Sequence, residues 1–228
     1  MRLSKPSLIL LLAALTWPLH FASAQNDNDV IDRPTSDPYK GDLAIFEGAD
    51  RAKKLQVERV MDLLGIRKGA QVADIGAGSG WFTVRAARRV GESGVVYAVE
   101  INRDYLRHIQ QRATDEKLRN VRTVLSQPDN PLLAEKSFDA ALLLKTYHEV
   151  AQPIALLRHL RAALKPGARL GIIDKNGNGS DHGLNAEVVI KEAARAGFTL
   201  AERHDDLVKA DGMDYFLIFA PNKSSTTR

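Results

Sequence analysis

Short apolar runs alternate with amphipathic stretches between about residues 51 and 220, and the runs have the length of buried strands. The expected strands are Gln71–Ile75, Val95–Val99, Val121–Leu125, Ser137–Leu144, Arg169–Asp174, Thr199–Arg203 and Tyr215–Ala220. The stretches between them predict helices over about 51–64, 82–90, 103–118, 153–164 and 185–196. This alternation predicts a single-domain α/β fold around a doubly wound, mostly parallel seven-stranded sheet. A ligand is then expected beyond the carboxyl ends of the strands.

Residues at the ends of these stretches support the helix boundaries. Asp50 and Asn102 are suitable N-caps, and Pro153 stands in a first helical turn. Gly65 and Gly197 are expected to end the helices before them.

Length and composition fit one domain, since 228 residues with 44% hydrophobic and 26% charged positions are ordinary for a globular chain. We expect a signal peptide at 1–24, a polar, flexible lead at 25–48, the folded domain at 49–221 and a disordered tail at 222–228.

The first 24 residues have the three parts of a secretory signal. Arg2 and Lys5 form a basic start, an apolar run covers Ser7 to Leu19, and Ala22-Ser23-Ala24 is a small-residue cleavage site. This pattern predicts export, to the periplasm in a bacterium, with cleavage after Ala24. The alternative is an uncleaved leader that anchors the protein, although the run is short for a membrane span.

Charge and cysteine content exclude several function classes. Loss of Arg2 and Lys5 lowers the formal charge from +4 to +2, and aromatic residues make up only 6% of the chain. A nucleic-acid platform needs more basic residues interleaved with aromatics, so no nucleic-acid partner is expected. The chain has no cysteine, which excludes disulfides, thiolate metal sites and cysteine nucleophiles.

A glycine-rich turn, Asp74-Ile75-Gly76-Ala77-Gly78-Ser79-Gly80, joins the first expected strand to a helix. Glycine lets the backbone turn tightly and approach a ligand, and the following helix start presents free N–H groups. A dinucleotide fingerprint places its third glycine at the sixth position, where this chain has Trp81. Glu100, at the end of the second strand, is placed to accept hydrogen bonds from ribose hydroxyls.

This G-x-G-x-G loop with its preceding acid resembles motif I of the class I S-adenosylmethionine (SAM) methyltransferases, which have a Rossmann-like fold. Ser137–Leu144 and Leu164–Leu170 are similar to that family's fourth strand and to the turn before its fifth strand. The resemblance covers about 51–220 and is strongest with the ubiquinone and menaquinone biosynthesis methyltransferases. It implies SAM as cofactor and a small-molecule methyl acceptor as partner, and the missing cysteines exclude a thiol-dependent arsenic methylation.

The resemblance also implies the cofactor-binding residues. These are Asp74, Gly76, Ala77, Gly78, Gly80, Glu100, Ile101, Gln127, Asp129 and Lys145. Gln127 departs from the family, which usually has an acid there for the adenine amino group, but a glutamine carbonyl accepts the same hydrogen bond.

The stretch Lys145-Thr146-Tyr147-His148-Glu149 follows the fourth strand, where the resemblance places residues that face cofactor and substrate. His148 is the preferred base or substrate-orienting residue, because histidine changes its charge near neutral pH. Tyr147 is expected to hydrogen-bond or to line the pocket. The alternative is that His148 only packs locally.

Asp174-Lys175-Asn176-Gly177-Asn178-Gly179 matches the opening of a calcium-binding loop. Its twelfth position is Asn185 rather than glutamate, and a strand rather than a helix precedes it, so no metal site is predicted. His182, in the same loop, either reaches the substrate pocket or is an exposed loop histidine.

The predicted function is transfer of a methyl group from SAM to a small molecule. The expected export argues for an alternative, because SAM is made in the cytosol. That alternative is an exported, non-catalytic protein that binds SAM or a nucleoside. A third hypothesis is an enzyme of the same fold with another reaction, since fold alone does not fix function.

Overall fold

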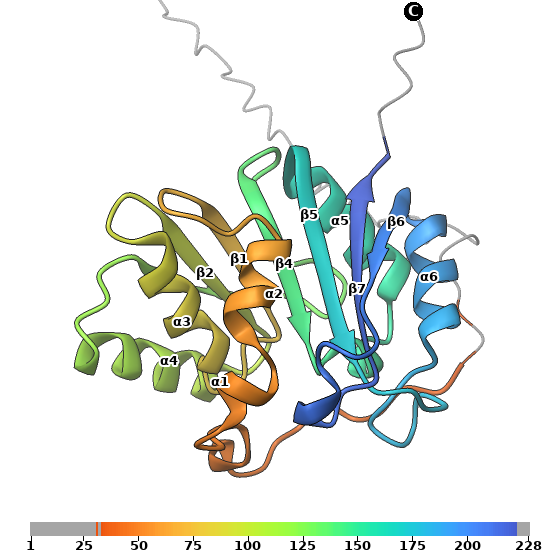
Figure 1. Cartoon of the computed structure of the whole chain (residues 1–228), viewed down its shortest axis with the longest axis horizontal. Coiled ribbons are helices and arrows are strands. Elements are labelled where there is room, and N and C mark those ends of the chain that lie inside the picture. Colours follow the sequence, from red (N-terminus) through yellow and green to blue (C-terminus); the bar gives the residue numbers. More distant parts are fainter. Residues whose placement is uncertain (1–30, 32, 223–228) are drawn as a thin grey trace, which may run out of the picture.

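The computed structural model describes residues 31 and 33–222 and shows a seven-stranded sheet in the order β3-β2-β1-β4-β5-β7-β6 (Figure 1). The strands are β1 (Gln71–Ile75), β2 (Val95–Glu100), β3 (Val121–Leu125), β4 (Phe138–Leu144), β5 (Leu164–Asp174), β6 (Phe198–Arg203) and β7 (Tyr215–Pro221). The first five strands run parallel, and β7 pairs antiparallel with both β5 and β6. The predicted α/β, mostly parallel, seven-stranded sheet is confirmed.

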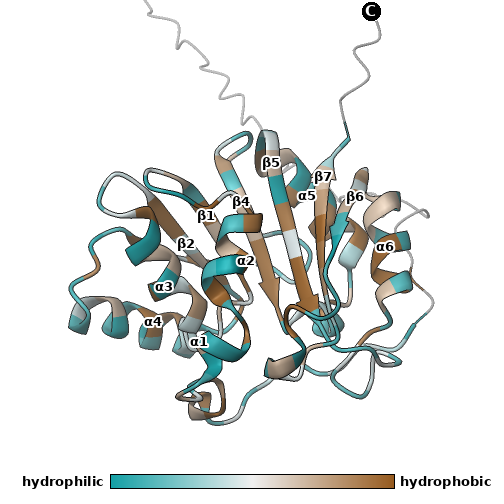
Figure 2. Ribbon diagram, viewed as in Figure 1, coloured by the Kyte–Doolittle hydropathy of each residue, from teal (hydrophilic) through white to brown (hydrophobic). Residues whose placement is uncertain are grey.

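Helices cover both faces of the sheet. They are α1 (Arg51–Lys54), α2 (Val57–Leu63), α3 (Trp81–Val90), α4 (Arg103–Asp115), α5 (Pro153–Ala163) and α6 (Ala186–Arg195), with short 3-10 turns η2 (Leu43–Phe46), η3 (Tyr147–Glu149) and η4 (Lys209–Asp211). Alternate strand residues supply two hydrophobic clusters, one shared with α2, α3 and α4 and the other with α5 and α6. The buried strands are accordingly the most hydrophobic part of the ribbon (Figure 2).

Two predicted helix starts are confirmed by side-chain hydrogen bonds. Asn102 accepts from the backbone N–H of Asp104 at the start of α4, and Asn185 accepts from that of Glu187 at the start of α6. Asp50, by contrast, makes no side-chain capping bond.

The predicted helix over 51–64 is wrong in one respect, because the chain breaks it into α1 and α2 at Gln56. That residue has a left-handed backbone with φ of 51°. Its side-chain amide donates to the carbonyl oxygen of Leu207, so a contact with a distant loop accompanies the break. Local apolar spacing continues through this position and gives no sign of it.

The segment before α1 runs beneath the carboxyl ends of the strands (Figure 1). Arg33 forms a buried ion pair with Glu192 of α6, with Nε and Oε1 2.7 Å apart. The Ser36 N–H donates to the carbonyl oxygen of His148, and its hydroxyl donates to that of Gly179. We call residues 33–47 the strap. The sequence analysis expected a flexible lead at 25–48, and the strap within that range makes tertiary contacts with η3, α6 and the loop after β5.

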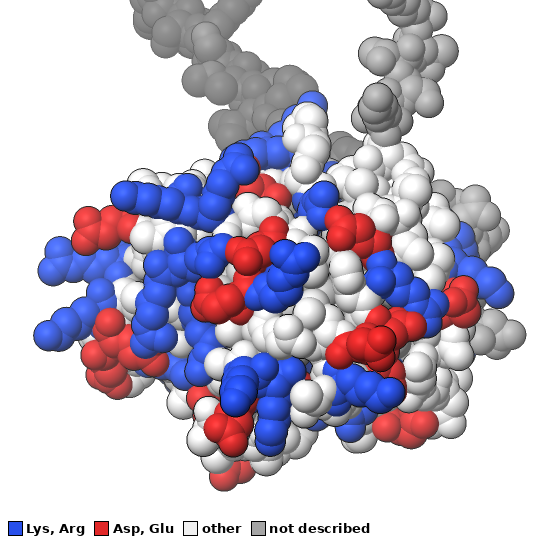
Figure 3. Space-filling view, in the orientation of Figure 1, with Lys and Arg blue, Asp and Glu red and all other residues white. Residues whose placement is uncertain are grey.

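The expected signal peptide at 1–24, its cleavage site after Ala24 and most of the tail from 222 lie outside the described residues. Within the described chain, no helix is long and apolar enough to cross a membrane. Basic and acidic side chains interleave on the face shown in Figure 3. For example, Arg89 of α3 forms ion pairs with Glu58 and Asp62 of α2.

Candidate functional site

A cavity of about 730 Å³ opens at the carboxyl ends of β1, β2 and β4, where the topology predicts a ligand. Its volume lies within the range of small-molecule sites. The glycine loop and the end of β2 form one side, and the turn after β4 forms another. The strap contributes Thr35 to Lys40 and Phe46. The site is thus closed partly by residues that the sequence analysis placed outside the folded domain.

The glycine loop has the backbone conformation that its sequence predicts. Gly76, Gly78 and Gly80 all have positive φ, at 68°, 54° and 74°. A Cβ atom on Gly76 would lie 2.4 Å from the Thr146 hydroxyl oxygen, so the loop packs against the turn after β4. The N–H groups of Gly76 and Ala77 are bound to the Val99 carbonyl oxygen, which ties the loop to β2.

Replacing Gly76 with alanine is expected to destabilise the protein by about 2 kcal/mol, because the left-handed backbone disfavours a Cβ and the Thr146 hydroxyl must also move. Urea unfolding of the variant measures this change. The double variant with Thr146→Ala should recover the part due to the clash, while the backbone cost remains. A Gly76→Ala variant as stable as wild type would contradict this packing.

Asp74 lies at the end of β1, is 2% exposed and lines the cavity. Its Oδ2 accepts a hydrogen bond of 2.6 Å from the Thr83 hydroxyl at the start of α3. Burial, together with the neighbouring charge of Glu100, raises the pKa of Asp74 to about 7 despite this bond. A cationic ligand group beside Asp74 would favour its ionised form.

Glu100 also lines the cavity, but it has the local partners that the sequence analysis did not foresee. Its Oε2 accepts from the N–H of Gly78, and its Oε1 accepts from those of Ile101 and Asn102. These bonds orient the carboxylate and join the end of β2 to the glycine loop.

Most of the other expected cofactor residues also reach the cavity. Gly76, Ala77, Gly78, Ile101, Gln127 and Lys145 line it. Gly80 caps α3 from just behind the loop, and Asp129 stands outside the lining. Burial lowers the pKa of Lys145, whose neighbours include Lys175 and Arg51.

The turn η3 contains both residues expected to be catalytic, Tyr147 and His148. Tyr147 is fully buried on the α5 and α6 face of the sheet, and its hydroxyl donates to Glu192, which also pairs with Arg33. The structure therefore does not bring Tyr147 to the cavity. His148 is 1% exposed and is also absent from the cavity lining.

His148 is held by the aspartate that ends β5. Its Nδ1 lies 2.9 Å from both carboxylate oxygens of Asp174, which also accepts from the backbone N–H groups of His148 and Lys175. Asp174, the first residue of the calcium-like loop, is thus an orienting partner for a histidine. Asn185, at the twelfth position of that loop, caps α6.

Glu149, Arg51 and Trp81 are among the residues of the cavity wall to which sequence reasoning gave no role. Burial raises the pKa of Glu149 to about 7 although His148 is close. Arg51 stacks on the Trp81 ring, with its guanidinium carbon 4.4 Å from the ring centroid. The indole Nε1 of Trp81 is buried and has no hydrogen-bond partner among the described residues. The sequence signal for Trp81 was its position directly after the glycine loop, and that for Glu149 was its position directly after His148.

Comparisons with known proteins show similarity to methyltransferases. Residues 72–167 match the model of a family described as "Methyltransferase domain". The chain is 32% identical, over 115 residues, to the ubiquinone/menaquinone biosynthesis C-methyltransferase UbiE of Azotobacter vinelandii, which covers 50% of this chain and 46% of that protein. This chain thus spans about half the length of the curated relatives it matches.

Solved structures of other proteins share the fold. A SAM dependent methyltransferase from Aquifex aeolicus has a TM-score of 0.70 and 23% identity, covering 79% of this chain and 98% of its own. The [4+2]-cyclase SpnF has a TM-score of 0.64 and 17% identity, covering 82% and 87%. The matched domain and the fold imply SAM as the cofactor of an enzyme of this kind. Because SpnF is a cyclase, the fold alone does not fix the reaction.

Proposed function

We propose that this protein is a SAM-dependent methyltransferase that acts on a small-molecule acceptor. The observation that supports it most is the cavity itself, where the glycine loop, Asp74 and Glu100 meet at the carboxyl ends of β1 and β2. SAM supplies an activated methyl group, so the protein has to bind and orient the two reactants.

The residues present fit the parts of SAM. In our proposal Glu100 accepts hydrogen bonds from the ribose hydroxyls, and Asp74 faces the methionine amino group. The unpartnered Nε1 of Trp81 and the guanidinium of Arg51 suit the methionine carboxylate, because both are donors in the cavity wall. Gln127 is the acceptor for the adenine amino group. A buried donor without a partner and two acids in the same cavity wall are the pattern expected of a site for a zwitterionic ligand.

The acceptor side lies between the strap and the turn after β4 in this proposal. Tyr39 and Phe46 are in edge-to-face contact and offer an apolar surface, while Lys145 and Glu149 add polar groups. His148, which the sequence favoured as the base, acts here as a positioning residue behind Glu149 because its ring is away from the cavity.

Replacing Glu100 with alanine is expected to weaken SAM binding by about 1–3 kcal/mol, because charged hydrogen bonds are lost. Calorimetric titration of SAM into the purified protein measures it. Glu58→Ala, which removes an exposed acid of α2, is the matched control and should bind as wild type does. Unchanged affinity in Glu100→Ala would show that the ribose lies elsewhere.

Binding and turnover separate this proposal from its alternatives. A folded protein without measurable SAM affinity would contradict both the methyltransferase and the SAM-binding hypothesis. Formation of S-adenosylhomocysteine with a panel of small hydroxyl, amine and carbon nucleophiles supports transfer. SAM binding without transfer to any of them would favour the non-catalytic binding protein.

We further propose that the protein is exported, on the basis of the basic, apolar and small-residue segments in its first 24 residues. N-terminal sequencing of the protein from a bacterial periplasmic fraction should give Gln25 as the first residue. Retention in the membrane with Met1 intact would favour the uncleaved anchor.

A further inference from the structure

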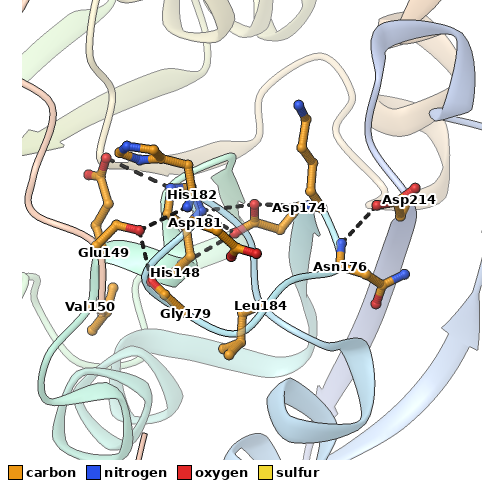
Figure 4. Close-up of polar contacts among 12 residues, drawn as sticks. His148, Glu149, Val150, Asp174, Asn176, Gly179, Asp181, His182, Leu184 and Asp214 are labelled. Carbon is orange, nitrogen blue, oxygen red and sulfur yellow. Dashed lines mark hydrogen bonds and ion pairs between the residues drawn. The ribbon is translucent and has the colours of Figure 1, made fainter. Parts of the chain in front are cut away.

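Three side chains that can bind a metal meet where β4 and β5 end, beside the cavity wall. They are His148 and Glu149 of η3 and His182 of the loop after β5 (Figure 4). One potential ligand atom from each lies within 4.8 Å of the other two. The described residues thus bring together two imidazoles and one carboxylate from segments more than thirty residues apart in the sequence.

The separations in this cluster suit ligands around one ion better than direct hydrogen bonds. His148 Nε2 and Glu149 Oε1 are 3.9 Å apart, which is too long for a hydrogen bond. Two ligand atoms at about 2.0–2.2 Å from one ion lie up to about 4.2 Å apart. Because all the ligand atoms lie within 4.8 Å of one another, a pair at that limit has to approach by about 0.6 Å. This shift is within reach of His182, because that residue is exposed.

His148 is presented as a ligand by its surroundings. Asp174, which has no exposed surface, holds Nδ1 and thereby turns Nε2 toward Glu149 and His182. Nε2 lies 3.9 Å from Glu149 Oε1, and the His148 side chain is only 2% exposed. A carboxylate behind the second nitrogen of a histidine is the usual support for a metal-binding imidazole.

His182 is fixed over the cluster by contacts from outside its own loop. Its N–H donates to the Ser36 hydroxyl, which in turn donates to the Gly179 carbonyl oxygen. Its backbone has a φ of 56°, which a non-glycine residue rarely adopts. The rings of His148 and His182 are 5.7 Å apart between centroids and nearly perpendicular. The strap thus holds this histidine at the site.

We propose that His148, Glu149 and His182 form a binding site for one divalent transition-metal ion, with Zn²⁺ or Fe²⁺ as the best-suited ions. Two imidazoles with one carboxylate suit such ions, whereas Ca²⁺ and Mg²⁺ prefer a shell of oxygen atoms. Three protein ligands leave coordination positions open, as in catalytic rather than structural sites. Glu149 also lines the cavity, so the proposed ion site borders the ligand space.

In this proposal the open positions bind an oxygen or nitrogen atom of the molecule that occupies the cavity. If the proposed function holds, that molecule is the methyl acceptor, and the ion lowers the pKa of its hydroxyl. This role depends on methyl transfer, whereas ion binding does not. The two ideas can therefore fail separately.

Metal binding is tested with the purified full chain after chelator treatment and dialysis. Titration with Zn²⁺ should give one ion per chain, and Co²⁺ should produce visible absorption bands that Zn²⁺ abolishes. His182→Ala and Glu149→Gln should each weaken Zn²⁺ binding at least about tenfold, since each removes or neutralises one ligand. Asp174→Asn should weaken it about 10–100-fold through the orientation of His148.

His108→Ala is the matched control, because it removes an exposed histidine of α4 and should leave Zn²⁺ binding unchanged. Circular dichroism checks that each variant is folded, and His182→Ala is the decisive variant because its side chain is exposed. Absence of saturable Zn²⁺ and Co²⁺ binding by the wild type would overturn the site. Binding that survives both His182→Ala and Glu149→Gln unchanged would overturn it too, because the ion would lie elsewhere.

Discussion

Replacing Asp74 with asparagine is expected to stabilise the ligand-free protein at pH 8 and to weaken its binding of SAM. Burial raises the pKa of Asp74 from 3.8 to about 7, so the folded state holds a proton that the unfolded state has lost. Between about pH 4 and pH 7 the wild type therefore loses stability as pH rises. The shift corresponds to roughly 4 kcal/mol, at about 1.4 kcal/mol per pKa unit.

The asparagine variant lacks this titration, and its free energy of unfolding should exceed that of the wild type by up to roughly 4 kcal/mol at pH 8. Urea unfolding of both proteins from pH 4.5 to 8 measures the difference. Glu149 titrates over the same range, so the difference between the two proteins isolates Asp74. Asp62→Asn, at a more exposed acid, should follow the wild type. Two parallel stability curves would show that Asp74 is not protonated near neutrality.

SAM binding should respond in the opposite direction. The wild-type affinity is expected to rise as pH increases through about 7, because an ionised Asp74 attracts the methionine ammonium. Asp74→Asn should bind SAM about tenfold more weakly at pH 8, through loss of a charged hydrogen bond. Calorimetry over the same pH series checks both effects. A gain in stability without a loss of affinity would place the amino group away from Asp74.

Replacing Arg33 with alanine is expected to destabilise the protein by about 3–5 kcal/mol, because it leaves the Glu192 carboxylate buried without its cation. The paired side chains are only 7% and 5% exposed, and two hydrogen bonds join them. At about 2–4 °C per kcal/mol, the melting temperature should fall by about 10 °C. Thermal unfolding followed by circular dichroism measures it, with the exposed Arg59→Ala as control.

Making Arg33→Ala in a Glu192→Gln variant distinguishes the effect of an unpaired charge from a simple loss of contact. In Glu192→Gln the carboxylate is absent, so adding Arg33→Ala should cost much less than in the wild type. Arg33→Ala should also weaken SAM binding, because the strap lines the cavity. A loss below about 1 kcal/mol would show that Glu192 is solvated in solution.

The sequence predicted the parts of this protein that depend on local chemistry. Strand positions follow from runs of apolar residues, and the alternation with helices placed the cavity at the carboxyl ends of the sheet. The glycine spacing predicted a loop whose three glycines all have positive φ. Asn102 and Asn185 form bonds with residues two positions away, which a local pattern can reveal.

Contacts between distant segments could not be predicted in this way. The break at Gln56 accompanies a bond to Leu207, and the polar segment after residue 25 looked flexible because its partners, Glu192 and Gly179, lie far along the chain. Tyr147 and Asp129 stand near the motifs in sequence, but neither reaches the cavity.

The clearest example of a contact between distant segments is the cluster of His148, Glu149 and His182. The sequence by itself determined that a histidine and a glutamate follow β4 and that another histidine follows β5. Only the tertiary structure decided that they meet, because parallel pairing places the ends of β4 and β5 side by side while the strap and Asp174 fix the two imidazoles. Residue spacing fixes local conformation, whereas the direction of a side chain depends on everything packed around it.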